Sequence, residues 1–168
     1  MRYFQKLIVF CIAMTGCITV NFASTSLLTS NLSENVMVLS NCNITTANVT
    51  LSFGSYDPTA IAIESNLDSM TTFSVRCTKG TSASISLSNG LNANGSVRRM
   101  TNSIGSFLNY QLYTDASRSN VWNNINTYNY VADNFAPQTF SIYGRIPGGQ
   151  DNVSAGSYSD AVVITVTF

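Results

Sequence analysis

The feature that most constrains the fold of this chain is a repeated alternation of apolar and polar residues. The last segment shows it best, because Val162, Ile164, Val166 and Phe168 occupy every second position up to the final residue. A period of two places such a set of side chains on one face of a β-strand, whereas a helix requires a period near 3.6. The alternation therefore predicts an all-β chain that ends in a strand running from Tyr158 to Phe168.

Further segments show the same alternation and are separated by turns rich in Gly, Asn, Asp and Ser. The expected strands span residues 49–53, 70–78, 83–88 and 138–143, together with a segment around Leu108, Tyr110 and Leu112. Asn94-Gly95 and Pro147-Gly148-Gly149 are two of the turn signals between them. Six or seven short strands in one domain are typical of a two-sheet sandwich of immunoglobulin type.

Residues 1–23 have the pattern of a secretory signal peptide. Arg2 and Lys6 form a short positive region, and the apolar run that follows is too short to span a bilayer. We expect cleavage after Ala23, with cleavage after Cys17 as the alternative and lipidation of Cys17 as a third reading. The pattern predicts an exported protein.

The charge of the mature chain argues against several functions. Loss of Arg2 and Lys6 leaves six basic residues against eight acidic ones, a net charge of −2. No basic patch remains to attract a phosphate backbone, so we expect no nucleic-acid partner. The chain contains no histidine, the commonest acid–base group, and its aspartates lie in turn-like contexts. We therefore expect neither an enzyme nor a cofactor.

Four cysteines are present, and two of them, Cys11 and Cys17, lie in or beside the signal peptide. The remaining pair, Cys42 and Cys77, predicts a disulfide in an exported chain. Two buried free thiols are the alternative. We expect no metal site, because two thiols without a histidine cannot complete a tetrahedral zinc site.

The two ends of the mature chain are unusual. The final strand stops without a following partner, which would leave an open sheet edge. Before Cys42, the segment 26–39 is not a polar tail but carries residues of one parity that are largely apolar. These residues are Leu28, Ser30, Leu32, Glu34, Val36 and Val38. Two interpretations stay open: the segment is the first strand of its own sandwich, or it fills the groove of another subunit.

Several stretches, in this order and spacing, match a known family. They are CNI at 42–44, LSFGSYD at 51–57, FSVRC at 73–77, SLSNG at 86–90, RRM at 98–100, LNYQLYTD at 108–115, VW at 121–122 and GSYSDAVVITVTF at 156–168. Over nearly the whole mature chain, the sequence resembles the spore coat protein U domain family, which includes the pilins of archaic chaperone–usher pili.

The resemblance implies an incomplete immunoglobulin-like sandwich, residues 41–168, that is completed by a donor strand from a neighbouring subunit. It implies that residues 24–40 are the donor segment, with Leu28, Ser30, Leu32, Val36 and Val38 facing the groove. The acceptor edge, which a chaperone would hold first, is implied to be Val162, Ile164, Val166 and Phe168. Ser30 and Glu34 depart from an apolar donor pattern and leave the register open.

The implied partners are a periplasmic chaperone, an outer-membrane usher and other pilus subunits, including copies of the same chain. The implied location is the cell surface, reached through the periplasm. Because a tip adhesin of these systems has two domains and this chain has one, the resemblance favours a shaft or adaptor subunit.

Two other functions compete with a pilus subunit, a secreted coat protein and a small carbohydrate-binding sandwich. An aromatic set could form a binding face, although packing in the core and across strands is the favoured interpretation. Its members are Tyr110, Tyr113, Trp122, Tyr128 and Tyr130.

Overall fold

The computed structural model describes residues 27–59 and 65–168 of the 168-residue chain. The expected signal peptide, residues 1–23, lies outside the described residues and stays a prediction. The chain divides into two units, residues 1–37 and residues 38–168. No helix in the described part is long and apolar enough to cross a membrane.

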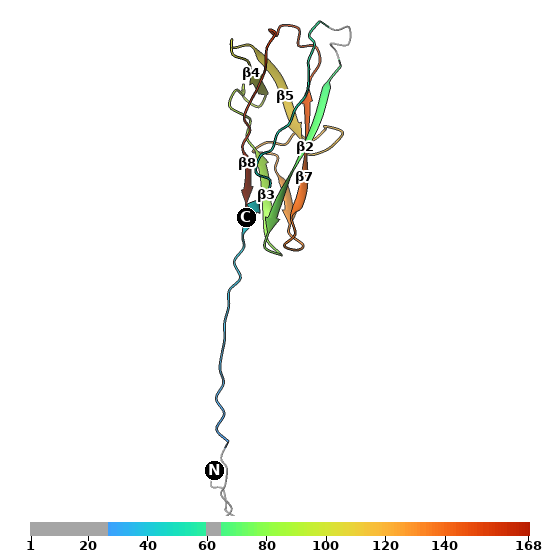
Figure 1. The fold of residues 1–168 in the computed structure, drawn as a ribbon. Coiled ribbons are helices and arrows are strands. Elements are labelled where there is room, and N and C mark those ends of the chain that lie inside the picture. The colour runs from blue at the N-terminus through green and yellow to red at the C-terminus, as the bar shows by residue number, and fades with distance from the viewer. Residues whose placement is uncertain (1–26, 60–64) are drawn as a thin grey trace, which may run out of the picture. The chain divides into compact units, whose positions relative to one another are not determined.

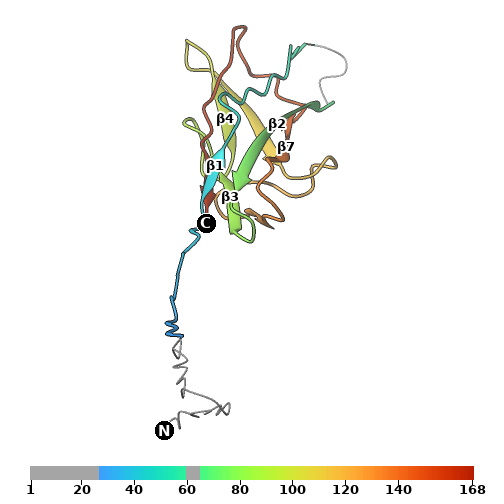
Figure 2. The same ribbon diagram turned by 60° about the horizontal axis from the view of Figure 1, so that its bottom comes forward.

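The second unit is built from antiparallel strands in two sheets (Figures 1 and 2). Eight strands form within the described residues: β1 (Cys42–Ile44), β2 (Leu67–Cys77), β3 (Ser82–Leu87), β4 (Arg98–Thr101), β5 (Phe107–Tyr113), β6 (Tyr128–Val131), β7 (Gln138–Ile146) and β8 (Ile164–Thr167). One sheet has the order β1-β2-β7-β5-β4 and the other the order β6-β3-β8. The predicted all-β fold with two sheets is confirmed.

The core forms where the alternating residues of the two sheets face one another. Phe73 and Val75 of β2 are fully buried, as are Ile85 and Leu87 of β3 in the opposite sheet. Trp122 lies in the middle of this layer, and its indole Nε1 donates a hydrogen bond to the Ile85 carbonyl at 2.9 Å. The buried indole therefore gains a partner for its polar atom, as a tryptophan in a core requires.

The disulfide between Cys42 and Cys77 is confirmed. The two cysteines lie directly opposite each other in the antiparallel pair of β1 and β2. The bond therefore pins the short edge strand β1 to the longest strand of the sheet.

The sequence predicts correctly which side chains of the strands face inward. At two places, however, the predicted bounds of a strand are wrong. Residues 49–53 form no assigned strand, and the last strand begins at Ile164 rather than at Tyr158. Both segments alternate in burial as expected, but a strand assignment also requires a neighbouring strand to pair with. The sequence pattern does not predict β1, β4 and β6, because strands of three or four residues carry too little alternation to be recognised.

The described part of the first unit, residues 27–37, contains no helix or strand. Its apolar side chains are exposed: Leu28 is 93% exposed, Leu32 83% and Val36 92%. Val38, at the start of the second unit, is 78% exposed. An unpartnered run of apolar side chains of one parity is unusual in water.

Candidate functional site: a groove between two unpaired strand edges

The first edge of the groove is formed by the C-terminal segment. The Ser88 amide donates to the Val163 carbonyl at 2.9 Å, and Ser159 exchanges two hydrogen bonds with Thr101 of β4, both at 3.0 Å. These bonds use odd-numbered positions, so the backbone groups of the even-numbered positions point to the opposite side. Because β8 is the outermost strand of its sheet, no strand in the described part of the chain pairs with that side.

The second edge is formed by the segment that follows β1. The Thr45 amide still donates to the Ser74 carbonyl at 2.8 Å, but residues 49–53 then leave the sheet and pair with no described strand. Val49, Leu51 and Phe53 are half-buried, whereas the residues between them are exposed. This segment is therefore extended. Its alternate side chains turn inward, but it forms no ladder of backbone hydrogen bonds with a described strand.

Gly144 of β7 explains why this segment can lie so close to the core. A Cβ atom at this position would come within 2.6 Å of the side chains of both Leu51 and Phe53. Glycine therefore leaves the space that these two side chains occupy over the inner face of the sheet. Any larger residue at this position would push the second edge outward.

Between the two edges lies a groove with a mostly apolar floor. Its first part has a volume of about 370 Å³, and a second part of about 810 Å³ extends along residues 50–59 and 153–158. The floor of the first part includes Leu87, Leu112 and Ile142, and its walls include Leu51, Val162 and Ile164. At one end β1 comes into contact with β8 (Figure 2). The arrangement is a sandwich from which one strand is missing.

The carboxylate of Asp160 lines the first part of this groove. It accepts hydrogen bonds from the Tyr110 hydroxyl at 2.7 Å, the Leu91 amide at 2.9 Å and the Asn92 side-chain amide at 3.1 Å. Gly90 lies so close that a Cβ atom there would collide with the carboxylate, and its φ of +85° also favours glycine. Burial, reinforced by the hydrogen bond to Asp160, raises the pKa of Tyr110 above its usual value.

Arg98 is fully buried behind this wall. Its guanidinium donates to the carbonyls of Ser88 and Trp122, at 2.7 and 2.8 Å from Nη2, and to the Gln111 side chain at 3.1 Å. Burial lowers the pKa of Arg98, while the nearby Tyr110 and Asp160 act in the opposite direction. The side chain joins β4 to the end of β3 and to the Trp122 loop, a role that the sequence did not reveal.

The sequence-predicted acceptor residues are only partly brought together. Val162 and Ile164 line the groove, and Val166 is half-buried beyond it. Phe168 is 54% exposed and does not line the groove.

The aromatic residues do not form one binding face. Tyr110 and Trp122 are buried in the core. Tyr128 and Tyr130 pack edge-on against Phe140, with ring centroids 5.4 and 5.0 Å away. The main role of Tyr128 and Tyr130 is packing between strands, in agreement with the core-packing interpretation.

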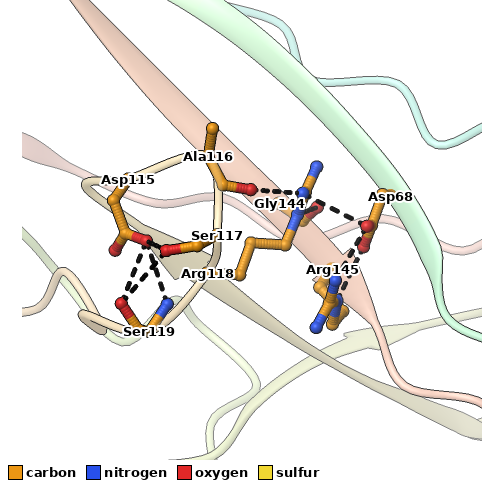
Figure 3. Close-up of polar contacts among 8 residues, drawn as sticks. All are labelled: Asp68, Asp115, Ala116, Ser117, Arg118, Ser119, Gly144 and Arg145. Atoms are coloured by element: carbon orange, nitrogen blue, oxygen red, sulfur yellow. Dashed lines mark hydrogen bonds and ion pairs between the residues drawn. The ribbon is translucent and has the colours of Figure 1, made fainter.

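A second polar cluster lies on the five-stranded sheet (Figure 3). Arg118 has a φ of +56° and donates to the carbonyls of Gly144, at 3.1 Å, and Ala116, at 2.8 Å. Asp68 pairs with Arg118 at 3.2 Å and with Arg145 at 2.7 Å, and the Arg145 hydrogen bond lowers the pKa of Asp68. Through these contacts the cluster anchors the loop after β5 to β2 and β7.

Comparison with known proteins identifies the family. The model of the spore coat protein U domain matches residues 26–165. The chain belongs to the spore coat protein U domain family. Protein U of Myxococcus xanthus is 35% identical over 158 residues, which cover 87% of this chain and 88% of that protein.

A solved structure is similar to the chain in its fold. It is a chain of the CsuC–CsuE chaperone–tip adhesion subunit pre-assembly complex from the archaic chaperone–usher Csu pili of Acinetobacter baumannii. The identity is 27% and the TM-score 0.54, and the match covers 78% of this chain but only 40% of that one. The immunoglobulin-like sandwich is thereby confirmed, and the family is structural rather than enzymatic. These findings support a pilus-related structural protein.

Proposed function

We propose that this chain is a subunit of a bacterial surface pilus and that its groove receives the N-terminal segment of a neighbouring copy. One observation carries the proposal: the sandwich has an apolar groove between two unpaired strand edges, and the same chain has an exposed segment that alternates at strand spacing. The groove lacks one strand, and the segment has the pattern of one strand.

The backbone of the groove walls supports a strand as the occupant. Buried backbone N–H and C=O groups almost always find partners, yet the groove-facing groups of residues 160–166 have no described strand beside them. An inserted strand would supply a ladder of hydrogen bonds, and its alternate side chains would enter the apolar floor. Affinity and specificity would then come from different parts of the same contact.

The donor segment, residues 24–40 in this proposal, contains a stretch as long as the C-terminal edge, because Leu28–Val38 and Tyr158–Phe168 both have eleven residues. From Leu28 to Val38 an extended strand spans about 36 Å at ~3.3 Å per residue. Burying Leu28, Leu32, Val36 and Val38 would contribute roughly 6–12 kcal/mol as an upper bound. Ordering the strand and joining two subunits offset part of this gain.

The same edge explains the proposed assembly partners. An open strand edge beside an apolar groove promotes aggregation, so the subunit needs a partner from the moment it folds. In this proposal a periplasmic chaperone first binds the edge of Val162, Ile164, Val166 and Phe168. An outer-membrane usher is the place where the donor segment of the next subunit replaces the chaperone. The subunit would belong to the shaft or adaptor of the fibre.

Removal of the donor segment tests the proposal. A mature chain without residues 24–38 should keep its disulfide and bind a synthetic peptide of residues 26–39, but it should not join a fibre as the incoming subunit. The readout is the ladder of bands that unheated full-length protein gives in detergent gels. A full-length chain that stays a stable monomer without a chaperone, gives no ladder and gains no stability from the peptide would contradict the proposal.

A coat protein is the second candidate, and the description of the matching family favours it. Strand exchange could build a coat layer as well as a fibre. Immunogold labelling of producing cells separates the two, because a pilus subunit appears on thin surface fibres and a coat protein in a continuous layer.

A further inference from the structure

We propose that Asp160 sets the register of the inserted strand by accepting a hydrogen bond from the Ser30 hydroxyl of the neighbouring copy. This inference rests on the proposed function, because it assigns one contact within the proposed strand exchange. It makes Ser30 and Asp160 the residues that determine where along the groove the donor stops.

Neither the donor nor the groove is uniformly apolar. On the parity that would face the groove, the donor segment carries five polar residues, Ser24, Ser26, Ser30, Glu34 and Ser40. Of these, only Ser30 has a leucine two residues away on each side. Along its first edge the groove carries one carboxylate, Asp160, which lies between Tyr158 and Val162 in the same wall. The registers can therefore be ranked by the donor residue that each one places against Asp160.

Only one register pairs Asp160 with a serine that has a leucine two residues away on each side. With Ser30 level with Asp160, Leu28 and Leu32 lie two residues away on either side, level with Tyr158 and Val162. This match holds whether the donor runs parallel or antiparallel to the wall, because the two leucines are symmetric about Ser30.

The other registers leave a poor contact at Asp160. A shift of four residues in one direction places Glu34 against Asp160, and two carboxylates in a low-dielectric groove repel strongly. The same shift in the other direction places Ser26 there, with the polar Ser24 level with Tyr158 or Val162. A shift of two residues places a leucine there and covers the carboxylate with apolar groups that offer no hydrogen bond.

Asp160 is prepared to accept one more hydrogen bond. An ionised carboxylate has about four acceptor sites, and three donors from Tyr110, Leu91 and Asn92 already use it. The close fit at Gly90 restricts the carboxylate further. A serine hydroxyl is a small donor that can use the remaining site, whereas a glutamate cannot donate when ionised.

The test uses the full mature chain and measures the ladder that it forms in unheated detergent gels. Ser30→Glu should lower the ladder yield at least about tenfold, because it brings a second carboxylate to Asp160. The matched control is Asn31→Glu, which adds the same charge on the opposite face of the strand and should assemble like the unmodified chain. Ser30→Gln, of the size of glutamate but neutral, should assemble far better than Ser30→Glu.

A second variant on the groove side completes the cycle. Asp160→Asn removes the charge and keeps one acceptor oxygen, and its own ladder yield is the reference for the cycle. In this background Ser30→Glu should lower the yield by no more than about threefold, against about tenfold in the unmodified chain. If Asp160→Asn fails to fold, the comparison of Ser30→Gln with Ser30→Glu tests the register by itself.

Two results would overturn the register: equal assembly of Ser30→Glu and Asn31→Glu, or no recovery in a folded double variant. They leave the proposed function intact as long as the unmodified chain forms ladders that are lost without residues 24–38. If the unmodified chain forms no ladder, the proposed function fails instead.

Discussion

Two regions of the sandwich carry the same sequence pattern but differ in what surrounds it. In β2, Phe73 and Val75 are at most 1% exposed, because β2 lies between β1 and β7 and faces the second sheet. In the segment after β1, Leu51 and Phe53 alternate in the same way but stay half-buried beside the groove. The comparison shows that alternation selects the face of a strand, whereas full burial needs a neighbour on each side.

The largest expected effect tests this difference directly. Phe73→Ala should lower the free energy of unfolding by about 3–5 kcal/mol, because it leaves a cavity in a closed core. Leu51→Ala should lower it by less than about 1 kcal/mol in the empty domain, since water can enter the groove.

Urea denaturation of both variants, with and without the peptide of residues 26–39, measures these costs. The peptide should raise the cost of Leu51→Ala and leave that of Phe73→Ala unchanged. Equal costs for the two variants in the empty domain would break the comparison.

A smaller effect is expected at the polar wall of the groove. Tyr110→Phe removes the hydroxyl that donates to Asp160 and should cost about 1.5–3 kcal/mol at neutral pH, as for other hydrogen bonds to charged groups. The folded protein raises the pKa of Tyr110 above its usual value of 10.0, mainly through burial.

The pH dependence follows from the direction of this shift. The stability that a raised pKa contributes is fully present below the unfolded value near 10 and is lost as the pH rises above it. Denaturation at pH 8 and at about pH 10.5 should therefore show a steeper loss for the unmodified chain than for Tyr110→Phe. Identical losses would show that Tyr110 does not titrate differently in the two states.

The smallest effect is expected at Arg118, which does not line the groove. Its φ of +56° is strained for any residue with a Cβ atom, so Arg118→Gly should be more stable than Arg118→Ala by about 1 kcal/mol. Both variants lose the same ion pair with Asp68, which contributes little at the surface. Thermal unfolding compares them, and a more stable alanine variant would show that the loop relaxes without its arginine.

The sequence by itself determined which residues face inward and which two cysteines pair. Each follows from a local or compositional rule: alternation along β2, β3, β5 and β7 reflects the geometry of a strand, and an even pair of thiols in an exported chain forms a disulfide. The matching motifs also identify the family of the chain from the sequence alone.

The tertiary structure alone decided where the sandwich stays open. Whether residues 49–53 acquire a ladder depends on a partner strand from elsewhere in the chain or from another chain, and no property of those residues encodes its absence. The same holds for Asp160, whose partner Tyr110 is 50 residues away in sequence. Gly90 and Gly144 were the available signals, but a glycine reveals that a neighbour comes close only after the fold has brought that neighbour to it.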